Sequence, residues 1–341
     1  MSVTAKELAK QLHLSEASVS IALNNKPGVS TATRKKILEA AKAAGYDFTK
    51  VKENVNPVSA LKGTIYFIIY RKHGAVVADT PFFSQLSMGI DAGCKKYHYH
   101  LNVSYLDEGT YTEETFQDMF HFDCKGILLL GTEMHREDIL PFTKLNIPFV
   151  VLDTYFETLR ANYVLINNIQ GAYLATDYLI RHCRTQPGYL RSSYAINNFQ
   201  ERADGFYKAV RAHGMSTSKS VVHSLSPSVE GAYADMLEIL DAGEPLAQAY
   251  FADNDLIACG AIRALNSRGY EIPNDISVVG FDNLPVSTYM EPALTTVNVP
   301  KQYLGEAAVC RLAQMIDQKD TIPMKLEIST TLVTRKSVLT H

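Results

Sequence analysis

The stretch TAKELAKQLHLSEASVSIAL, residues 4–23, predicts two short helices joined by a tight turn. Thr4 and Glu7 have the spacing of a capping box, in which a hydroxyl and a carboxylate satisfy free amides at the start of a helix. Ser15 can cap the second helix in a similar way. Because a third capped helix follows, residues 1–46 are expected to form a small helical domain.

Charge is unevenly distributed along the chain. The 341 residues carry a net charge of −3, but residues 1–62 carry +5 and the remainder carries −8. Two helices joined by a tight turn in a basic segment indicate a helix-turn-helix that binds DNA. A helical bundle that serves only for docking or dimerisation is the alternative. A basic head on an acidic body favours contact between the head and a polyanion.

The composition is that of a soluble globular protein, with 46% apolar and 20% charged residues. No stretch approaches the roughly 18 to 20 apolar residues of a membrane span. Charged residues also stand near the N-terminus, where a signal peptide would have its apolar region. The five cysteines lie far apart and form no CxxC pair, which predicts neither disulfides nor a zinc site. We therefore expect a cytoplasmic protein without cofactor or metal.

From residue 64 onwards, short apolar runs alternate with helical patterns. Examples of predicted strands are TIYFIIY (64–70), YVLI (163–166), SYAI (193–196) and ISVVGF (276–281). Such alternation predicts an α/β fold with two doubly wound parallel-sheet subdomains after the helical head. The expected boundaries are a head at 1–46, a linker or hinge at 47–62 and a body at 63–341, divided into an N-subdomain (63–161 plus 292–323) and a C-subdomain (162–291 plus 324–341).

Several motifs resemble those of the LacI family of bacterial transcription repressors. The head carries LSEASVSIALN (14–24), VSTATR (29–34) and AAKAAGY (40–46), and the body carries PFFSQLSMGI (81–90) and IPNDISVVGFDN (272–283). The resemblance covers nearly the whole chain. It implies a DNA-binding repressor that acts as a homodimer or tetramer, with a periplasmic-binding-protein-like body that binds a small-molecule effector such as a sugar.

The second helix would supply the residues that read DNA. Glu16 can accept a hydrogen bond from a cytosine amino group, or serve only as a solvated carboxylate at the helix start. Ile21 can contact only a thymine methyl, where the family often has a polar residue. Val55 stands nearest to the leucine that the family's hinge helix inserts into the minor groove. The expected DNA-contacting residues are Thr4, Ser15, Glu16, Ala17, Ser18, Ser20, Ile21, Asn24, Arg34 and Val55.

Polar and aromatic residues at predicted strand ends mark an effector pocket, because the carboxyl ends of parallel strands face a common cleft. Of Phe82 and Phe83, one ring is expected in the pocket and the other in the core. A flat ring surrounded by Asp, Asn and Arg suits a sugar. Each polar residue alone could instead be an exposed loop residue. The expected effector-binding residues are Phe82, Phe83, Asp153, Asn198, Arg202, Asn254 and Asp282.

Two rival functions are compatible with the α/β body. One is a periplasmic sugar-binding protein without DNA binding, which the helix-turn-helix argues against. The other is an enzyme acting on a sugar. The sequence lacks the phosphate-binding, dinucleotide-binding, nucleophile-elbow and zinc-protease motifs, so we predict that the protein is not an enzyme.

Overall fold

The computed structural model describes residues 4–23, 29–44, 46, 61–72, 74, 76–77, 80–110, 116, 120, 123–320 and 322–339. The chain forms two compact units, residues 1–60 and residues 61–341, which we call the head and the body. Most of the predicted linker, residues 47–60, lies outside the described residues.

The described residues of the head form three helices, as the sequence predicts. They are α1 (Ala5–Leu12), α2 (Glu16–Leu23) and α3 (Thr31–Ala43). The capping box is formed, since Thr4 Oγ1 accepts from the Glu7 amide at 3.3 Å and the Glu7 carboxylate accepts from the Thr4 amide at 2.8 Å. Ser15 Oγ accepts from the Ser18 amide at 3.1 Å, which confirms the predicted cap of α2.

A small apolar core holds the three helices together. On α2, Val19, Ala22 and Leu23 are buried against Leu8 of α1 and Ile37 of α3. The opposite face of α2 is left exposed. This division follows from the helical period, which brings residues three and four apart to one side.

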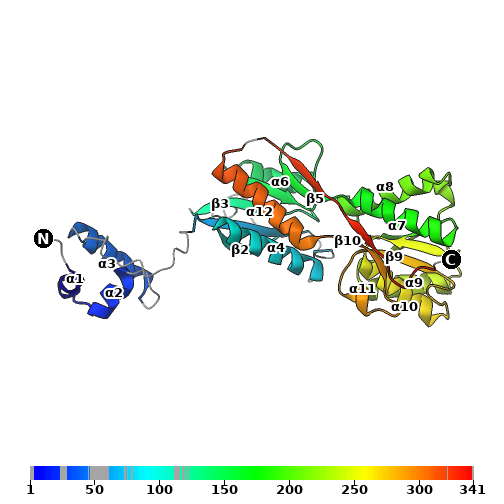
Figure 1. The fold of residues 1–341 in the computed structure, drawn as a ribbon, viewed down its shortest axis with the longest axis horizontal. Helices are drawn as coiled ribbons and strands as arrows, with labels where there is room; N and C mark the ends of the chain where they lie inside the picture. The colour runs from blue at the N-terminus through cyan, green and yellow to red at the C-terminus, as the bar shows by residue number, and fades with distance from the viewer. Residues whose placement is uncertain are drawn as a thin grey trace. The chain divides into compact units, whose positions relative to one another are not determined.

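The body contains two separate sheets, each flanked by helices (Figure 1). The first sheet is parallel throughout and has the order β11-β5-β4-β3-β1-β2. Its four central strands are mostly buried, as expected of parallel strands between helices, whereas the edge strands β2 and β11 are largely exposed. We call this half the first lobe. It contains β1 (Thr64–Arg71), α4 (Pro81–Tyr97), β2 (His100–Asp107), β3 (Cys124–Leu130), α6 (Arg136–Thr143), β4 (Phe149–Leu152), β5 (Asn162–Ile166), α12 (Lys301–Asp317) and β11 (Lys325–Ile328).

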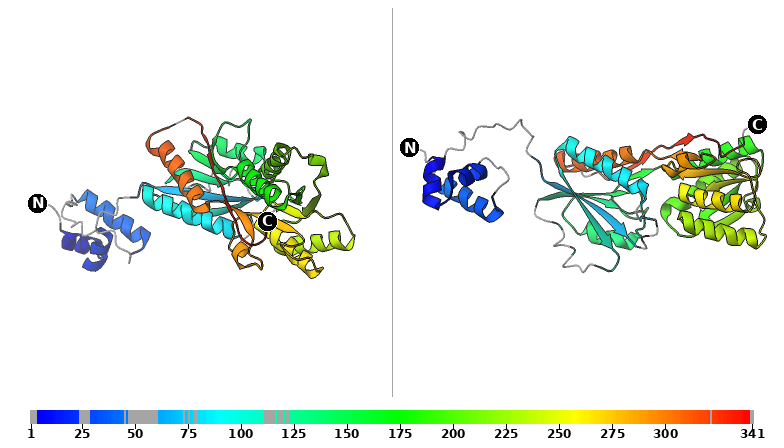
Figure 2. Two further views of the ribbon diagram at one scale, coloured as in Figure 1. Left: turned by 45° about the vertical axis from the view of Figure 1, so that its right-hand side comes forward. Right: turned by 90° about the horizontal axis from the view of Figure 1, so that it is seen from below.

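The second sheet has the order β12-β10-β9-β8-β6-β7 and is parallel except for the edge strand β12. Figure 2 shows helices on both sides of it. We call this half the second lobe. It contains α7 (Asn168–Cys183), β6 (Gly188–Ser192), α8 (Asn197–Ala212), a 3-10 turn (Thr217–Lys219), β7 (Val222–Leu225), α9 (Val229–Asp241), β8 (Ala249–Ala252), α10 (Asp255–Ser267), β9 (Ser277–Asp282), α11 (Val286–Tyr289), β10 (Thr295–Asn298) and β12 (Thr331–Val333).

The chain passes between the lobes three times, and this corrects the expected subdomain boundaries. Residues 162–166 and 325–328 belong to the first sheet, because β5 pairs with β4 and β11. Residues 295–298 belong to the second sheet, because β10 pairs with β9. Each expected assignment was the reverse. Buried parallel strands have the same apolar pattern in both lobes, so the pattern alone does not specify their sheet.

The predicted strand at residues 193–196 is also wrong. The strand is β6, residues 188–192, and residues 193–196 connect it to α8. The Ser192 amide, at the end of β6, donates to Asp253 Oδ2 at 2.7 Å. The Asp253 side chain therefore accepts the hydrogen bond that a backbone carbonyl of a neighbouring strand would otherwise accept. The segment 193–196 then runs at the carboxyl end of the sheet, where binding residues gather.

No helix among the described residues is long and apolar enough to cross a membrane. All five cysteines lie in the described part of the chain and are free thiols.

Candidate functional site

The head presents one face of α2 to its surroundings. Glu16, Ala17 and Ser20 are exposed, while Ser18 and Ile21 are partly buried. The Glu16 carboxylate lies 3.9 Å from Lys6 Nζ in a pair that is mostly exposed, so it constrains Glu16 little. Five of the predicted DNA-contacting residues therefore lie on one accessible helix.

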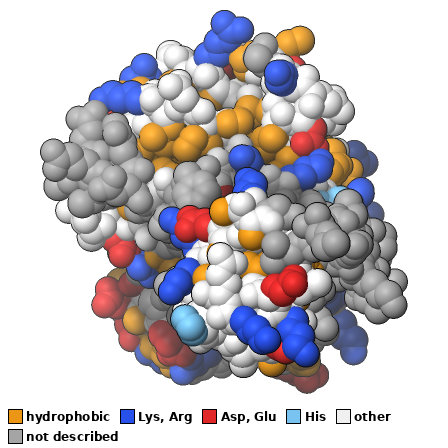
Figure 3. Space-filling view, turned by 90° about the vertical axis from the view of Figure 1, so that its left-hand side faces the viewer, with side chains coloured by type: hydrophobic (Ala, Val, Ile, Leu, Met, Phe, Trp, Pro, Cys, Tyr) orange, Lys and Arg blue, Asp and Glu red, His pale blue; other side chains and the backbone are white. Residues whose placement is uncertain are grey.

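Three of the other predicted DNA contacts, Thr4, Ser15 and Arg34, lie among the described residues. The Thr4 and Ser15 hydroxyls are engaged in the caps of α1 and α2. Arg34 Nη1 donates to the Ala22 carbonyl at 3.4 Å, which ties α3 to α2. Asn24 and Val55 lie outside the described residues. Figure 3 shows basic and acidic side chains interspersed on the face that it draws.

All seven predicted effector-binding residues line one cavity between the two lobes of the body. Asp153 and Asp282 come from the carboxyl ends of β4 and β9, and Arg202 comes from α8. The cavity has about 40 Å³ of free space, enough for a few waters and too little for a sugar ring without some opening. Its remaining lining residues are Val76, Thr80, Thr132, Ile196, Phe199, Pro227, Leu256 and Leu284.

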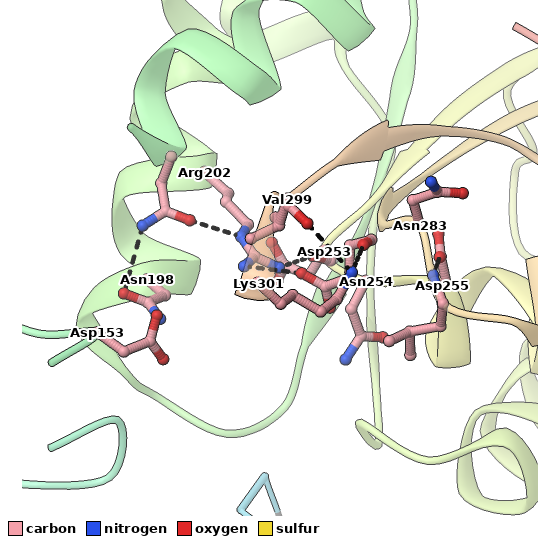
Figure 4. Close-up of polar contacts among 12 residues, drawn as sticks. Asp153, Asn198, Arg202, Asp253, Asn254, Asp255, Asn283, Val299 and Lys301 are labelled. Carbon is pink, nitrogen blue, oxygen red and sulfur yellow. Dashed lines mark hydrogen bonds and ion pairs between the residues drawn. The ribbon is translucent and has the colours of Figure 1, made fainter. Parts of the chain in front are cut away.

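Arg202 is the centre of the polar network in the second lobe. Its side chain is buried, and its guanidinium donates to Asn168 Oδ1 at 2.9 Å, to the Asp253 carbonyl at 2.5 Å and to Asp282 Oδ1 at 3.2 Å. The same group lies 3.8 Å from the centroid of the Phe281 ring. Figure 4 labels Arg202 and, of these partners, Asp253. This arrangement holds the guanidinium at the cavity before any ligand binds.

A second buried cation lies behind Asp282. Lys301 Nζ donates to the Asp282 carbonyl and, at 3.3 Å, to the Val299 carbonyl. Burial lowers the pKa of Lys301 and raises that of Asp282, although the attraction between opposite charges opposes both shifts. Since Lys301 begins α12 in the first lobe and Asp282 ends β9 in the second, these contacts connect the lobes.

Asp255 is the most strongly perturbed carboxyl near the site. It is fully buried and accepts from the Leu284 amide at 2.7 Å and from Thr296 Oγ1 at 2.5 Å. Burial, reinforced by the nearby Asp282 charge, raises its pKa to about 8. The neutral acid is therefore the favoured form of Asp255 at pH 7.

Asp153 provides the carboxylate on the first-lobe side of the cavity. Its Oδ2 accepts from Thr132 Oγ1 at 2.7 Å, whereas no group among the described residues makes a well-formed hydrogen bond to Oδ1. Burial raises the pKa of Asp153 to about 6. A buried acceptor at a cavity wall is suited to a hydroxyl of a bound molecule.

The remaining predicted residues have structural contacts as well. Asn254 caps α10 by accepting from the Ile257 amide at 2.9 Å, and Asn198 Oδ1 accepts from Asn168 Nδ2 at 3.3 Å. Phe82 and Phe83 both line the cavity, and Phe82 also belongs to the apolar core. The expected division into one pocket ring and one core ring is therefore too simple, because Phe82 does both.

Sequence reasoning missed several groups that organise the cavity. Asp253 and Asp255 flank Asn254, which was predicted to bind the effector, and their position at the end of β8 was the available signal. Asn168, at the start of α7, was not among the predicted residues. The actual cap is Asn167, which accepts from the Gln170 amide at 2.8 Å, while Asn168 contacts Arg202. Within the described residues no group of His, Cys, Asp and Glu could hold a metal ion.

Comparison with known proteins defines the class. Residues 176–338 match the family model of a periplasmic binding protein-like domain. Relatives that cover nearly the whole chain are transcriptional repressors with a helix-turn-helix. The chain is therefore similar to transcriptional regulators of the LacI family, in agreement with the fold class and the resemblance expected from the sequence.

Three individual relatives illustrate the similarity. The chain is 29% identical to the HTH-type transcriptional repressor PurR of Pasteurella multocida (strain Pm70), with 98% of each chain covered. It is 27% identical to the ribose operon repressor of Haemophilus influenzae, again over 98% of each chain. A solved complex of the transcriptional regulator CelR with cellobiose has 25% identity and a TM-score of 0.71, covering 98% of this chain and 99% of that one.

Proposed function

We propose that this protein is a cytoplasmic transcriptional repressor whose head binds an operator and whose body binds a small sugar. The observation that carries the proposal is the cavity at Arg202, Asp153 and Asp282 in a chain that also has a helix-turn-helix. Effector binding would change the operator affinity through a difference in effector affinity between two states of the body. By linkage, the operator then changes effector affinity by the same factor.

The chemistry of the cavity favours a sugar. Carboxylates on two sides can accept from hydroxyls, Arg202 can donate, and the Phe82 and Phe83 rings offer apolar faces to C–H groups. A regulator that resembles this chain is known in complex with cellobiose, and a curated relative is named for the ribose operon. These likenesses support a sugar, and the choice between monosaccharide and disaccharide is left to experiment.

We further propose a homodimer as the functional unit. The edge strand β2 exposes Val103 and Tyr105, and α4 exposes Met88 at 60% of its surface. Exposed apolar side chains on neighbouring elements favour a protein contact. A pair of heads would match a partly palindromic operator. Sedimentation of the intact protein at micromolar concentration distinguishes a dimer from a monomer or a tetramer.

Gel-shift titration against fragments of the source genome tests operator binding. We expect one or a few preferred fragments, with affinity falling by orders of magnitude between about 50 and 200 mM salt as phosphate contacts are lost. Titration calorimetry of the same protein with a panel of pentoses, hexoses and disaccharides tests effector binding. Failure to prefer any fragment at low salt, with or without sugars, would refute the proposed repressor, and sugar turnover would favour an enzyme instead.

A further inference from the structure

One carboxylate in the first lobe accepts four main-chain hydrogen bonds from the connection between β1 and α4. Glu133 Oε2 accepts from the amides of Lys72 and Gly74, both at 2.9 Å. Its Oε1 accepts from the amides of Val76 at 2.8 Å and Val77 at 2.9 Å. The Glu133 residue is only 4% exposed. A carboxylate offers about four lone-pair sites, so it can accept from all four of these described amides.

The backbone that Glu133 holds forms part of the cavity wall. Val76 and Thr80 line the cavity, and Val77 is buried in the core of the body beside Phe82. Glu133 itself does not line the cavity, so its effect on a ligand would be exerted through these residues. The Glu133 carboxylate thus accepts the backbone hydrogen bonds that a neighbouring strand would accept in a sheet.

Glu133 is also adjacent in sequence to a group at the cavity. Thr132, the preceding residue, donates its hydroxyl hydrogen bond to Asp153. Two consecutive residues after β3 therefore position the cavity: Thr132 holds the Asp153 carboxylate, and Glu133 holds the backbone of the cavity wall. A displacement of Thr132 and Glu133 would therefore move both Asp153 and the backbone that lines the cavity.

A second contact holds the start of the same connection. Lys72 Nζ lies 2.9 Å from Glu108 Oε1 and 3.2 Å from Asp138 Oδ2. Its side chain is only 12% exposed, so the ammonium group is largely withdrawn from water. The connection is thus held by its amides at Glu133 and by the Lys72 side chain at two other acids.

We propose that Glu133 is a positioning residue that sets the affinity and the selectivity of the effector cavity by fixing the backbone at Lys72, Gly74, Val76 and Val77. The inference rests on the proposed function of the cavity. Glu133 touches no effector in this scheme. Its role is to keep Val76 and Thr80 at the distance at which they can contact one.

A carboxylate is required for this role. Glutamine has the same shape but only one acceptor oxygen, and its amino group would face two amide donors. Glu133→Gln therefore loses two of the four bonds and leaves two buried or partly buried amides without this acceptor. Glu133→Asp keeps both oxygens, but it is one methylene shorter and reaches fewer of the amides. The matched control is Asp123→Asn, because Asp123 accepts from Thr64 Oγ1 at the opposite end of the same sheet.

The first measurement is hydrogen exchange on the full-length protein without sugar. In wild type and Asp123→Asn, a peptide covering residues 70–80 should show protected amides. In Glu133→Gln that protection should fall by about tenfold or more, with Glu133→Asp intermediate, while peptides from α7 and α10 stay unchanged. Unchanged protection of residues 70–80 in both Glu133 variants would overturn the proposal.

The second measurement is calorimetric titration of the same proteins with D-ribose, D-galactose and cellobiose. For the sugar that wild type prefers, Glu133→Gln should weaken binding by about tenfold. The ratio between its affinity and the affinities for the other two sugars should become smaller. Operator affinity without sugar should stay within about twofold of wild type. Lost amide protection with unchanged sugar affinities would reduce Glu133 to a fold brace and overturn the proposal. If wild type bound no sugar, the proposed function would fail, and so would the inferred effect of Glu133 on sugar affinity. Hydrogen exchange would still test whether Glu133 fixes the backbone.

Discussion

The head and the body hold their candidate functional residues in opposite environments. In the head, the expected DNA-reading residues Glu16, Ala17 and Ser20 are exposed, and a separate set of apolar residues forms the core. In the body, Arg202 and Asp282 are buried and bonded to each other. At these three exposed residues of the head, the proposed DNA contacts are separate from the core, whereas in the body the proposed effector contacts also contribute to stability.

The difference has an energetic basis. An exposed side chain can change without cost to the core, and most such changes alter stability by less than about 0.5 kcal/mol. A buried charged side chain leaves unpaired partners behind when it is removed. Substitutions that alter binding should thus leave the melting temperature nearly unchanged in the head and lower it in the body.

Arg202→Ala should have the largest effect. It leaves Asp282 and ligand groups unpaired in a buried site, which should cost about 2–5 kcal/mol of effector binding and also lower the melting temperature. Arg211→Ala is the matched control, since Arg211 lies exposed on the same helix. Calorimetry with the preferred sugar and thermal unfolding measure both effects. A lower melting temperature with unchanged sugar affinity would mean that Arg202 only braces the fold.

The pH dependence of stability should come from the body. The folded-state pKa of Asp255, about 8, lies above that of a free aspartate, so folding favours the protonated form. Its stabilising contribution is complete below about pH 4 and is lost as the pH rises through 8, on the order of 1 kcal/mol per pH unit. Asp255→Asn, which resembles the neutral acid, should flatten the loss between pH 6 and pH 8. Urea unfolding at both pH values measures it, and an equal loss in variant and wild type would exclude Asp255 as the source.

Ile21→Arg should alter the preferred operator sequence and leave the fold intact. Ile21 is only partly buried, and arginine can donate to a guanine that isoleucine cannot contact. A changed base preference is worth about 1–3 kcal/mol per position. Leu38→Arg adds the same charge on α3 and should change only general affinity. Selection from a randomised operator library compares them, and identical preferences for wild type and Ile21→Arg would show that Ile21 does not read DNA.

Ser15→Ala should give the smallest effect. It removes the acceptor for the Ser18 amide and should destabilise the head by about 1 kcal/mol. Ser15→Asp should restore most of the loss, because aspartate also caps helices well. Thermal unfolding of residues 1–60 as a separate fragment or within the full chain measures the change. No loss in the alanine variant would show that the cap is dispensable.

The parts of the fold that could be predicted from sequence depend on local or repeated chemistry. The Thr4–Glu7 capping box involves residues three apart, and α2 and the strand ends follow from periodicity. The seven cavity residues could be grouped because strand ends in parallel sheets converge on one edge. The lobe of residues 163–166 could not be predicted, because it depends on a pairing with residues far along the chain.

Lys301 and Glu133 escaped sequence analysis for a related reason. Lys301 donates to carbonyl groups, and Glu133 accepts from amides. Main-chain groups are the same at every position, so no residue pattern identifies which of them will be a partner. The side-chain partners of Arg202 were easier to find, since Asp282 stands in a recognisable segment at the end of a predicted strand.

The three passages between the lobes affect how the chain folds as it is made. The strands β11 and β12 lie within residues 325–333, and they pair with β5 and β10, whose free edges are exposed until then. Synthesis proceeds from the N-terminus, so most of both sheets can form while an unpaired edge remains on each. Such edges are sites where strands of other chains can pair. A nascent chain halted shortly before residue 325 should therefore aggregate more readily than one that has passed residue 333.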